Sequence, residues 1–547
     1  MIRAASEPKV PNEDAVDAET PPGRAKLPFT RKDLVIAGSL FVLALAIYIR
    51  TLAPDLLYGD SGEFQVLAIT GGLAHAFGYP VYLAIAKLFT FLPFESAPAR
   101  VSLLSAVLAC SAIAKVFLIS RSLGVRRFYS LLGALALMIS PLFWWQSIIA
   151  EVYTVAADCL AGCLLFAILW RCTRNGWWLA AGGLLGGLSL GMHHSVLLSL
   201  PFVIAYLFIA KATRRDWGLS TAGALGGAAI ALVAYLIMGS INSPPTSTNF
   251  MRPVASHFGL KSSDFDDPLT RIKFVFTGTQ FRREFQTSHF APNISRVKEE
   301  IANDFGWAVP LLAIVGILSL GVKRGHRKEA ALLIGTFGMV LLIPMFLNAF
   351  DLDVEFINAH LLMCIFAAVG LQRIQDLTLK EQPGHRMAWA TAFVAGLVLV
   401  VADWSILAGA RDAILAGKTT FLTGVRRIFP YEVDFPTRLH DTAAAVLPEV
   451  PDKALLLIDW SKIGAFYYVA LFELNKPNIE IAAPYPRTPI PPAESEFFKA
   501  FYREKAKTMP IFSDGAPEAL DYDFMQRPVV VGESGKVYLY SVAPRHP

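Results

Sequence analysis

The residues best suited to do chemistry lie in the stretch 50–80, which directly follows the first long apolar run. This stretch contains Asp60, Glu63 and His75 between apolar segments. Because the two carboxylates are three residues apart, a helix that begins at Ser61 with Asp60 at its N-cap places both on one face. A glycine pair then breaks the helical pattern and returns His75 toward them. Paired acids beside a histidine are groups that general acid-base catalysis uses.

A purely structural interpretation of the same residues is also open. Asp60 could cap a helix, and Glu63 could be its partner in a capping box. The setting favours a site, because a polar cluster at the end of a membrane span is costly in an apolar chain unless it serves a function. We therefore take the stretch 50–80 as the candidate reaction centre.

The composition predicts a polytopic membrane protein. The chain has 547 residues, of which 54% are hydrophobic and 17% charged, and its mean hydropathy is +0.48. The first thirty residues are polar and charged, so we expect no cleavable signal peptide and take the first apolar run as a signal anchor. Lysines and arginines gather at the ends of apolar runs, where they set orientation, so the net charge of +5 does not indicate nucleic-acid binding. The five cysteines lie in or beside apolar runs without disulfide or metal spacing.

The hydropathy pattern divides the chain into three parts. We expect a disordered cytoplasmic tail over 1–30, a transmembrane domain over 31–407 with about eleven spanning helices, and a soluble α/β domain over 408–547 on the outer face. Basic residues before the first span place the N-terminus inside. The first outer loop, 50–98, then carries the candidate reaction centre, and a second outer loop, 240–306, is long enough to be functional.

Individual segments are predicted in more detail. The apolar run 81–92 is too short to span and is expected to be an interfacial helix, whereas 128–148 is expected to be one span. The run 177–210 is too long for one helix and is expected to form an up-and-down pair with two histidines at its outer hairpin. In the soluble domain we expect strands at 454–459, 479–482, 529–532 and 537–541, and helices at about 433–447, 462–474 and 491–506.

The expected topology gathers the candidate site residues on the outer face. We take Asp60 and Glu63 as catalytic, and the substrate-binding candidates are His75, Tyr79, Glu151, Tyr153, His193, His194, Arg282 and Arg283. No metal ligands are assigned, although the run Asp351, Asp353 and Glu355 has the composition of a hard-cation site as well as that of a plain loop. A carboxylate base facing basic residues suits transfer from a lipid-linked phosphate.

Several of these candidates have simpler explanations. Glu151 could begin a helix, where its charge favours the N-terminus. His193 and His194 could be ordinary residues of an interfacial hairpin. Arg282 and Arg283 could belong to a solvated loop face.

Taken together, the motifs are similar to a known family. TLAPDLLYGDSGEF, HAFGYPVYLAIAKLF, RVSLLSAVLAC, AEVYTV and GLSLGMHHSVLLSLP occur in the same order as in the integral-membrane protein O-mannosyltransferase-like family, which belongs to the GT-C class of glycosyltransferases. The resemblance covers roughly residues 34–210, and it indicates a bacterial member. It implies an inverting transfer from a polyprenyl-phosphate sugar, with Asp60 as the base and with Glu63 and His75 shaping the site.

The leading hypothesis is a membrane glycosyltransferase that moves mannose or a similar hexose from a polyprenyl-phosphate donor to an acceptor hydroxyl. The acceptor could be Ser or Thr of a protein, or a glycan. The expected location is the bacterial inner membrane with the C-terminal domain in the periplasm, and a divalent metal is left open because GT-C branches differ in using one. Two alternatives remain: a transporter or flippase of lipid-linked glycans, and an assembly scaffold with a degenerate site.

Overall fold

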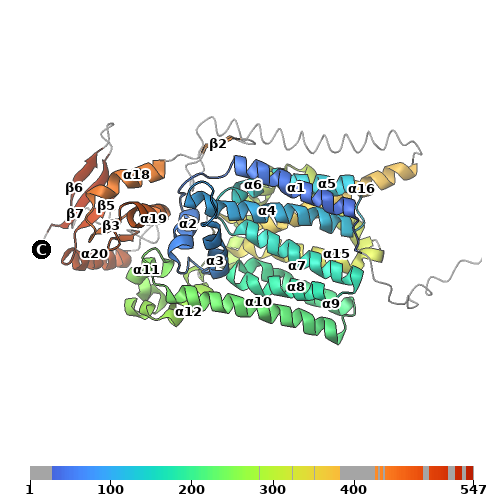
Figure 1. The fold of residues 1–547 in the computed structure, drawn as a ribbon, viewed down its shortest axis with the longest axis horizontal. Coiled ribbons are helices and arrows are strands. Elements are labelled where there is room, and N and C mark those ends of the chain that lie inside the picture. The colour runs from blue at the N-terminus through green and yellow to red at the C-terminus, as the bar shows by residue number, and fades with distance from the viewer. Residues whose placement is uncertain are drawn as a thin grey trace, which may run out of the picture.

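The computed structural model describes residues 27–282, 284–322, 324–349, 351–381, 426–428, 432–434, 438–483, 492–514, 524–531 and 537–545. Figure 1 shows a bundle of long helices at one end of the molecule and a sheet with its helices at the other. The expected tail 1–30, apart from its last four residues, and the last part of the expected transmembrane domain, 382–407, lie outside the described residues.

Six helical segments of the described part are long and apolar enough to cross a membrane, because a helix of about 20 residues spans roughly 30 Å. They are α1 (Arg31–Arg50), α4 (Ala97–Ser122), α7 (Tyr153–Thr173), α10 (Arg214–Ser240), the segment Arg327–Phe346 with α15 (Arg327–Leu342), and the segment Leu352–Leu377 within η10 (Leu352–Phe356) and α16 (Ile357–Glu381). The mostly helical membrane architecture expected from composition is confirmed. The expected number of eleven stays a prediction.

Two further candidate spans are bent pairs of helices. α5 (Arg127–Ile139) and α6 (Pro141–Ser147) meet at 65°, and the segment Thr287–Phe305, which contains α13 (Phe290–Phe305), meets α14 (Ala308–Val322) at 103°. The expected span over 128–148 is therefore bent, and whether the pair crosses the membrane as one span stays a prediction. Pro141 lacks the N–H that would continue α5, and the Ser140 hydroxyl accepts a hydrogen bond from Phe143 N (3.2 Å) to begin α6.

Shorter elements fill the ends of the bundle. α3 (Pro80–Phe89) is the short apolar helix expected after the reaction centre, and α8 (Trp177–Leu188) and α9 (Leu200–Ile209) form the expected pair. The turn between them consists of η2 (Ser189–Gly191) and η3 (His194–Ser199). The loop 240–306 contains α11 (Ser247–Met251), α12 (Pro268–Phe276) and the 3-10 turns η4 (Arg252–Phe258), η5 (Ser262–Asp266), η6 (Thr279–Phe281) and η7 (Thr287–His289).

Glycines allow some of the membrane helices to approach very closely. A Cβ at Gly187 of α8 would lie 2.2 Å from the carbonyl oxygen of Ala224 in α10, and one at Gly183 would lie 2.3 Å from that of Ser220. Gly316 of α14 is equally tight against Phe366 of α16. Such contacts let helix backbones pack where lipid offers no hydrophobic driving force.

The C-terminal part is an α/β unit, as expected. Its five-stranded sheet has the order β4 (Glu480–Ala482), β3 (Leu455–Leu457), β5 (Ile511–Ser513), β7 (Val537–Pro544) and β6 (Phe524–Val531), with parallel pairing among the first three and antiparallel pairing in the rest. The described helices are α18 (Arg438–Val446), α19 (Ile463–Tyr468), which continues as a π-turn over Val469–Glu473, and α20 (Pro492–Ala506). The strand β5 was missed by the sequence patterns. A separate hairpin pairs β1 (Arg426–Ile428) with β2 (Glu432–Asp434).

The α/β unit docks directly on α2 (Asp60–Thr70), the helix that follows the first span (Figure 1). A Cβ at Gly464 of α19 would lie 2.3 Å from the backbone carbon of Gly62, so the two backbones touch without intervening side chains. Gly59 N donates to Ser461 O at 2.7 Å. The position of α2 is therefore set partly by the C-terminal unit.

We expect Gly464→Ala to loosen this contact, because its methyl group would collide with the backbone of Gly62 and Glu63 rather than with a flexible side chain. Such overpacking costs about 1–3 kcal/mol. Hydrogen exchange of the full chain in detergent should then become faster in α2 and α19. Gly338→Ala is the matched control, because nothing lies within 4 Å of its added Cβ; unchanged exchange at α2 in Gly464→Ala would contradict the expectation.

Candidate active site

The two carboxylates of α2 do not cap the helix. The helix begins at Asp60, and its N-cap is Gly59, whose φ of +67° is one that glycine adopts most readily. Asp60 at the N-cap was therefore wrong by one residue. No side chain caps the helix, and the capping box between Asp60 and Glu63 is not formed. Both carboxylates instead face His75.

His75 lies between the two carboxylates, as the sequence predicted. Glu63 accepts a hydrogen bond from His75 N at 3.1 Å and contacts its Nδ1 at 2.6 Å, while His75 Nε2 lies 3.5 Å from Asp60 Oδ2. The Asp60 side chain is 31% exposed, compared with 12% for Glu63 and 15% for His75. Glu63 is thus committed to holding His75, whereas Asp60 is the carboxylate that a substrate can reach.

This arrangement retains a proton on His75. Burial alone lowers the pKa of His75, but the charges of Asp60 and Glu63 and the hydrogen bond to Glu63 outweigh it and raise the pKa to about 10. Burial also raises the pKa of Glu63. Both partners of the 2.6 Å contact therefore favour keeping the proton that lies between them. The site at neutral pH therefore contains an imidazolium that balances the acidic side chains.

Aromatic rings enclose this charged trio. The ring of Phe64 lies 5.6 Å from that of His75 and 5.4 Å from that of Tyr79, and Tyr79 in turn lies 5.2 Å from His75. The ring of Phe281, from the loop 240–306, lies 6.4 Å from His75 on another side. Burial and the charge of Asp60 raise the pKa of Tyr79, so its hydroxyl is a neutral donor, directed to Ala76 O at 3.1 Å.

Glu151 belongs to the same site. Its carboxylate accepts a hydrogen bond from the Ser61 hydroxyl at 2.8 Å, and its backbone N donates to Ser105 at 3.0 Å. The helix α7 begins after it, at Tyr153, and no side chain caps that helix. Burial, followed by the charge of Asp60, raises the pKa of Glu151. The structure thus shows Glu151 bound to α2 and not at the first turn of α7.

The hairpin between α8 and α9 completes one wall. The ring of His193 lies 5.4 Å from that of Tyr153 and 6.0 Å from that of Tyr79, so it faces the site. His194 packs on Phe77 at 4.2 Å, and its Nε2 bonds to the carbonyl of Leu190 at 2.9 Å. His193 is therefore a site residue, and His194 supports the loop that bears His75.

The acidic run before α16 also lies close enough to the site to act on its charges. Burial, followed by the charge of Asp60, raises the pKa of Asp351 to about 6. Glu355 is among the charges that act on Tyr79. By contrast, His360 lies against Asp304 at 3.1 Å and is fully buried in the bundle. Asp351 and Glu355 of this run therefore lie near the candidate site, whereas His360, farther along the chain, does not.

The predicted arginines have a mixed outcome. Arg282 is exposed and directly follows Phe281, which contacts His75, so it lies at the edge of the site. Arg283 lies outside the described residues. Arg252 and Arg271 of the same loop donate to carbonyl oxygens of the loop, and Arg271 also donates to Gly239 O of α10, so both hold the loop in place.

The trio also fits a divalent cation in its donor atoms. One ligand atom each from Asp60, Glu63 and His75 lie within 4.8 Å of one another. Two carboxylates and an imidazole suit a hard or borderline cation, which would neutralise phosphate charge when bound. Such a cation would have to displace the proton that His75 shares with Glu63.

Two contacts of the site were not foreseen. Ser61 links α2 to Glu151, and Trp460 of the C-terminal unit covers Gly59, with ring atoms 3.6 Å from the position of an added Cβ. The Trp460 side chain is nevertheless half exposed, at 50%. No pattern in the sequence paired Trp460 or Glu151 with α2.

The fold defines the class of protein. The oligosaccharyltransferase of Archaeoglobus fulgidus, in complex with Zn and sulfate, superimposes with a TM-score of 0.52 at 14% identity over 87% of this chain and 68% of that one. ArnT from Cupriavidus metallidurans bound to undecaprenyl phosphate gives 0.52 at 13% identity over 93% and 97%. At such identities the likeness concerns the fold, which is that of the GT-C membrane glycosyltransferases.

The family resemblance predicted from the motifs is confirmed. The N-terminal domain of the protein O-mannosyl-transferase TMEM260 family matches residues 60–216, which begin at Asp60 itself. A protein O-mannosyl-transferase from Dictyostelium discoideum is 22% identical over 81% of this chain and 56% of its own length. The TMEM260 protein of Mus musculus is 35% identical over 22% of this chain and 18% of its own. The chain thus spans about half the length of the first relative and less of the second.

We expect the buried charge of His75 to make stability depend on pH. Because its pKa is raised from 6.5 in the unfolded chain to about 10, the stabilising contribution is complete below pH 6.5 and is lost as pH rises through 10. His75→Asn should therefore have a lower Tm than the wild type at pH 6, and the difference should shrink toward pH 10.

His289→Asn is the matched control for this comparison. His289 lies in the loop 240–306 and has no carboxylate partner among the described residues. Its difference from the wild type should stay constant across the same pH range. A Tm difference for His75→Asn that is also constant with pH would show that His75 is not held charged.

Proposed function

We propose that this protein is a membrane glycosyltransferase that moves a hexose such as mannose from a polyprenyl-phosphate donor to an acceptor hydroxyl. The observation that carries the proposal is the accessible carboxylate of Asp60, which lies beside an imidazolium at the start of the segment 60–216 that matches the TMEM260 family. The relatives are protein O-mannosyl-transferases, so Ser or Thr of a protein is the first acceptor to test.

The proposed reaction is a single displacement at the anomeric carbon. Asp60 accepts the proton of the acceptor hydroxyl as that oxygen forms its bond to the sugar. The bond between the anomeric carbon and the phosphate oxygen breaks at the same time, and the electron pair leaves with the lipid phosphate. Attack from the opposite side inverts the configuration of the sugar. The base supplies roughly a hundred- to ten-thousandfold of the rate, and alignment of donor and acceptor supplies more.

The surrounding residues have distinct parts in this proposal. Glu63 fixes the ring of His75, whose positive charge lies 3.5 Å from the base. Glu151 holds Ser61, and through it the start of α2. Arg282, exposed beside the site, is the basic side chain placed to meet the departing phosphate. Tyr79, Tyr153 and His193 form the wall against which the sugar would rest.

The position of the site supports an enzyme over a transporter. A transport site is usually formed by broken helices near the middle of the membrane. Asp60 and Glu63 instead lie on α2, which packs against α19 of the C-terminal unit and so lies at the end of the bundle (Figure 1). The opposite end carries Arg121, Arg127 and Arg171, which favours a cytoplasmic location for that end and a periplasmic one for the site.

We expect Asp60→Asn to abolish sugar transfer while leaving the fold intact, because it keeps the shape of the side chain and removes the base. The loss should be about a hundredfold or more in kcat. The assay uses purified full-length protein, a panel of polyprenyl-phosphate sugars and Ser/Thr peptides, and detects products by mass spectrometry and the new anomeric bond by NMR.

Asp266→Asn is the control, since Asp266 is an exposed carboxylate that pairs with Arg252 in the loop 240–306. It should retain activity. Full activity of Asp60→Asn would exclude Asp60 as the base, and retention of anomeric configuration in the product would exclude the single displacement.

Trp460 is expected to contribute to acceptor binding, because its half-exposed ring lies beside the residue that precedes the base. Aromatic faces bind both peptides and sugar rings through apolar contact. Trp460→Ala should raise KM for the acceptor several-fold and leave KM for the lipid donor near the wild-type value. Trp307→Ala, which removes an exposed tryptophan elsewhere, should change neither; equal effects on both substrates in Trp460→Ala would argue for a general loosening of α2 instead.

A further inference from the structure

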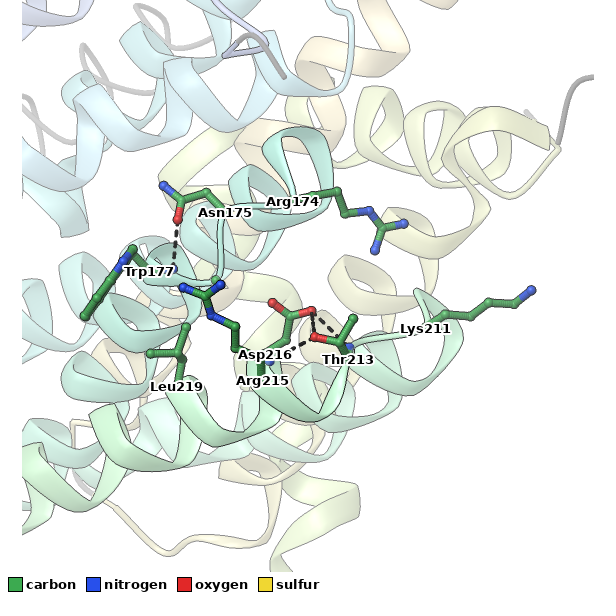
Figure 2. A pocket seen from close by; sticks show the side chains of 9 residues that line it. Arg174, Asn175, Trp177, Lys211, Thr213, Arg215, Asp216 and Leu219 are labelled. Atoms are coloured by element: carbon green, nitrogen blue, oxygen red, sulfur yellow. Dashed lines mark hydrogen bonds between the residues drawn. The ribbon is translucent and has the colours of Figure 1, made fainter. Parts of the chain in front are cut away.

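A basic cavity lies at the end of the bundle opposite the candidate active site. Its volume is about 540 Å³, and it is formed where the turn between α7 and α8 meets the turn between α9 and α10 (Figure 2). The lining residues are Arg174, Asn175, Gly176, Trp177, Lys211, Thr213, Arg215, Asp216 and Leu219. None of these residues belongs to the candidate active site.

Helix lengths separate the cavity from that site by about the thickness of a membrane. The helix α7 begins at Tyr153, in the wall of the candidate active site, and ends at Thr173, beside the cavity. Its 21 residues span about 31 Å, and the 27 residues of α10 span about 40 Å. The hydrocarbon core of a bilayer is about 30 Å thick, so the cavity lies at the other membrane surface.

The two turns are joined by a basic side chain. Arg174 Nη1 donates to the carbonyl of Ala210 at 3.0 Å, and its guanidinium lies 5.3 Å from the centre of the Trp170 ring. This bond holds Arg174 next to Lys211, and Figure 2 shows both side chains extending toward the same side. The cavity therefore has a fixed wall that carries positive charge.

The other two basic groups of the cavity are Lys211 and Arg215. Within the described residues, neither Lys211 nor Arg215 forms an ion pair. The single carboxylate of the lining, Asp216, is buried, and its Oδ2 accepts hydrogen bonds from Thr213 N and Thr213 Oγ1 at 3.0 and 2.8 Å. The lining thus has three basic side chains, Arg174, Lys211 and Arg215, against this one carboxylate, and its net positive charge favours an anion.

Apolar side chains beside the cavity face outward. The Trp177 side chain is 65% exposed and that of Phe208 is 67% exposed, and Ile209 lies next to it. Trp at the end of an apolar helix is typical of the level of lipid headgroups. The cavity thus opens where the lipid-facing surface of α8 and α9 meets the turns that carry its charges.

We propose that this cavity binds the phosphate-bearing headgroup of an anionic phospholipid, in the leaflet opposite the candidate active site. Basic pockets between membrane helices recognise such headgroups, and each nearby Lys or Arg contributes roughly 1 kcal/mol. The same phosphate chemistry could be offered by a soluble anion, but the exposed Trp177 and Phe208 favour a ligand that also has acyl chains. The ordinary enrichment of basic residues on one membrane side does not require a cavity or the bond from Arg174 to Ala210.

The test compares lipids on the full-length protein in detergent. Dioleoylphosphatidylglycerol and dioleoylphosphatidylcholine are titrated separately, and bound lipid is counted by native mass spectrometry while Tm is recorded. Phosphatidylglycerol should bind more tightly and raise Tm more. In Lys211→Gln/Arg215→Gln the half-saturating concentration should rise by about 25-fold, which corresponds to about fivefold per basic side chain.

Arg214→Gln is the matched control, because Arg214 is exposed in the same first turn of α10 and does not line the cavity. It should stay within about twofold of the wild type, since its charge adds only to the screened surface field. An equal loss in this variant, or no preference for phosphatidylglycerol in the wild type, overturns the proposal. The same rise in Tm with millimolar inorganic phosphate alone would assign the cavity to a soluble anion and also overturn it.

A second variant covers the case in which the double variant has a lower Tm than the wild type in phosphatidylcholine. Arg215→Gln alone should then raise the half-saturating concentration of phosphatidylglycerol about fivefold, and an unchanged value overturns the proposal.

Discussion

The contact of 2.6 Å between Glu63 and His75 is the interaction on which the candidate active site depends. Several carboxylates meet there in a partly buried space, where they would repel one another and lose hydration. The imidazolium between Glu63 and Asp60 offsets that cost and leaves Asp60 with an accessible oxygen. The same positive charge lowers the pKa of Glu151 and of Asp351 against the larger effect of burial, which raises both. The aromatic rings around His75 matter because they exclude water, which strengthens each of these charge interactions.

The short helix that carries these acids cannot be stable alone. The 11 residues of α2 fall below the length at which isolated helices persist in water. Its amide side chain Gln65 accepts from Leu57 N and donates to Asp55 O, Ser61 is held by Glu151, and Gly62 lies against Gly464. The segment just before α2 and two distant parts of the chain therefore fix one helix. This explains why the C-terminal unit belongs to the architecture of the site although it contributes none of the carboxylates.

The sequence predicted the parts of the site that depend on local spacing. Asp60, Glu63 and His75 were paired correctly, because helix periodicity and a glycine break act over a few residues. The bend at Ser140 was missed because 128–148 is uniformly apolar, and the hydropathy that identifies a span does not register a capping serine before a proline. The contacts of Gly464 and Trp460 with α2 could not be predicted at all, since they arise from tertiary packing between segments that share no local pattern. For the same reason Glu151 stayed ambiguous until its bond to Ser61 was seen.

The two ends of the bundle carry opposite charge, and this asymmetry has a physical consequence for orientation. At one end, Asp60, Glu63, Glu151 and Asp351 surround a single imidazolium. At the other, basic side chains outnumber acids, and the buried carboxylates of Asp33 and Glu329 are each bound by arginine. Lysines and arginines resist translocation far more than acids do, so insertion itself would direct the acidic end away from the cytoplasm. Under the proposed function, this orientation would place the site on the face where the proposed lipid-linked donor and the acceptor would meet.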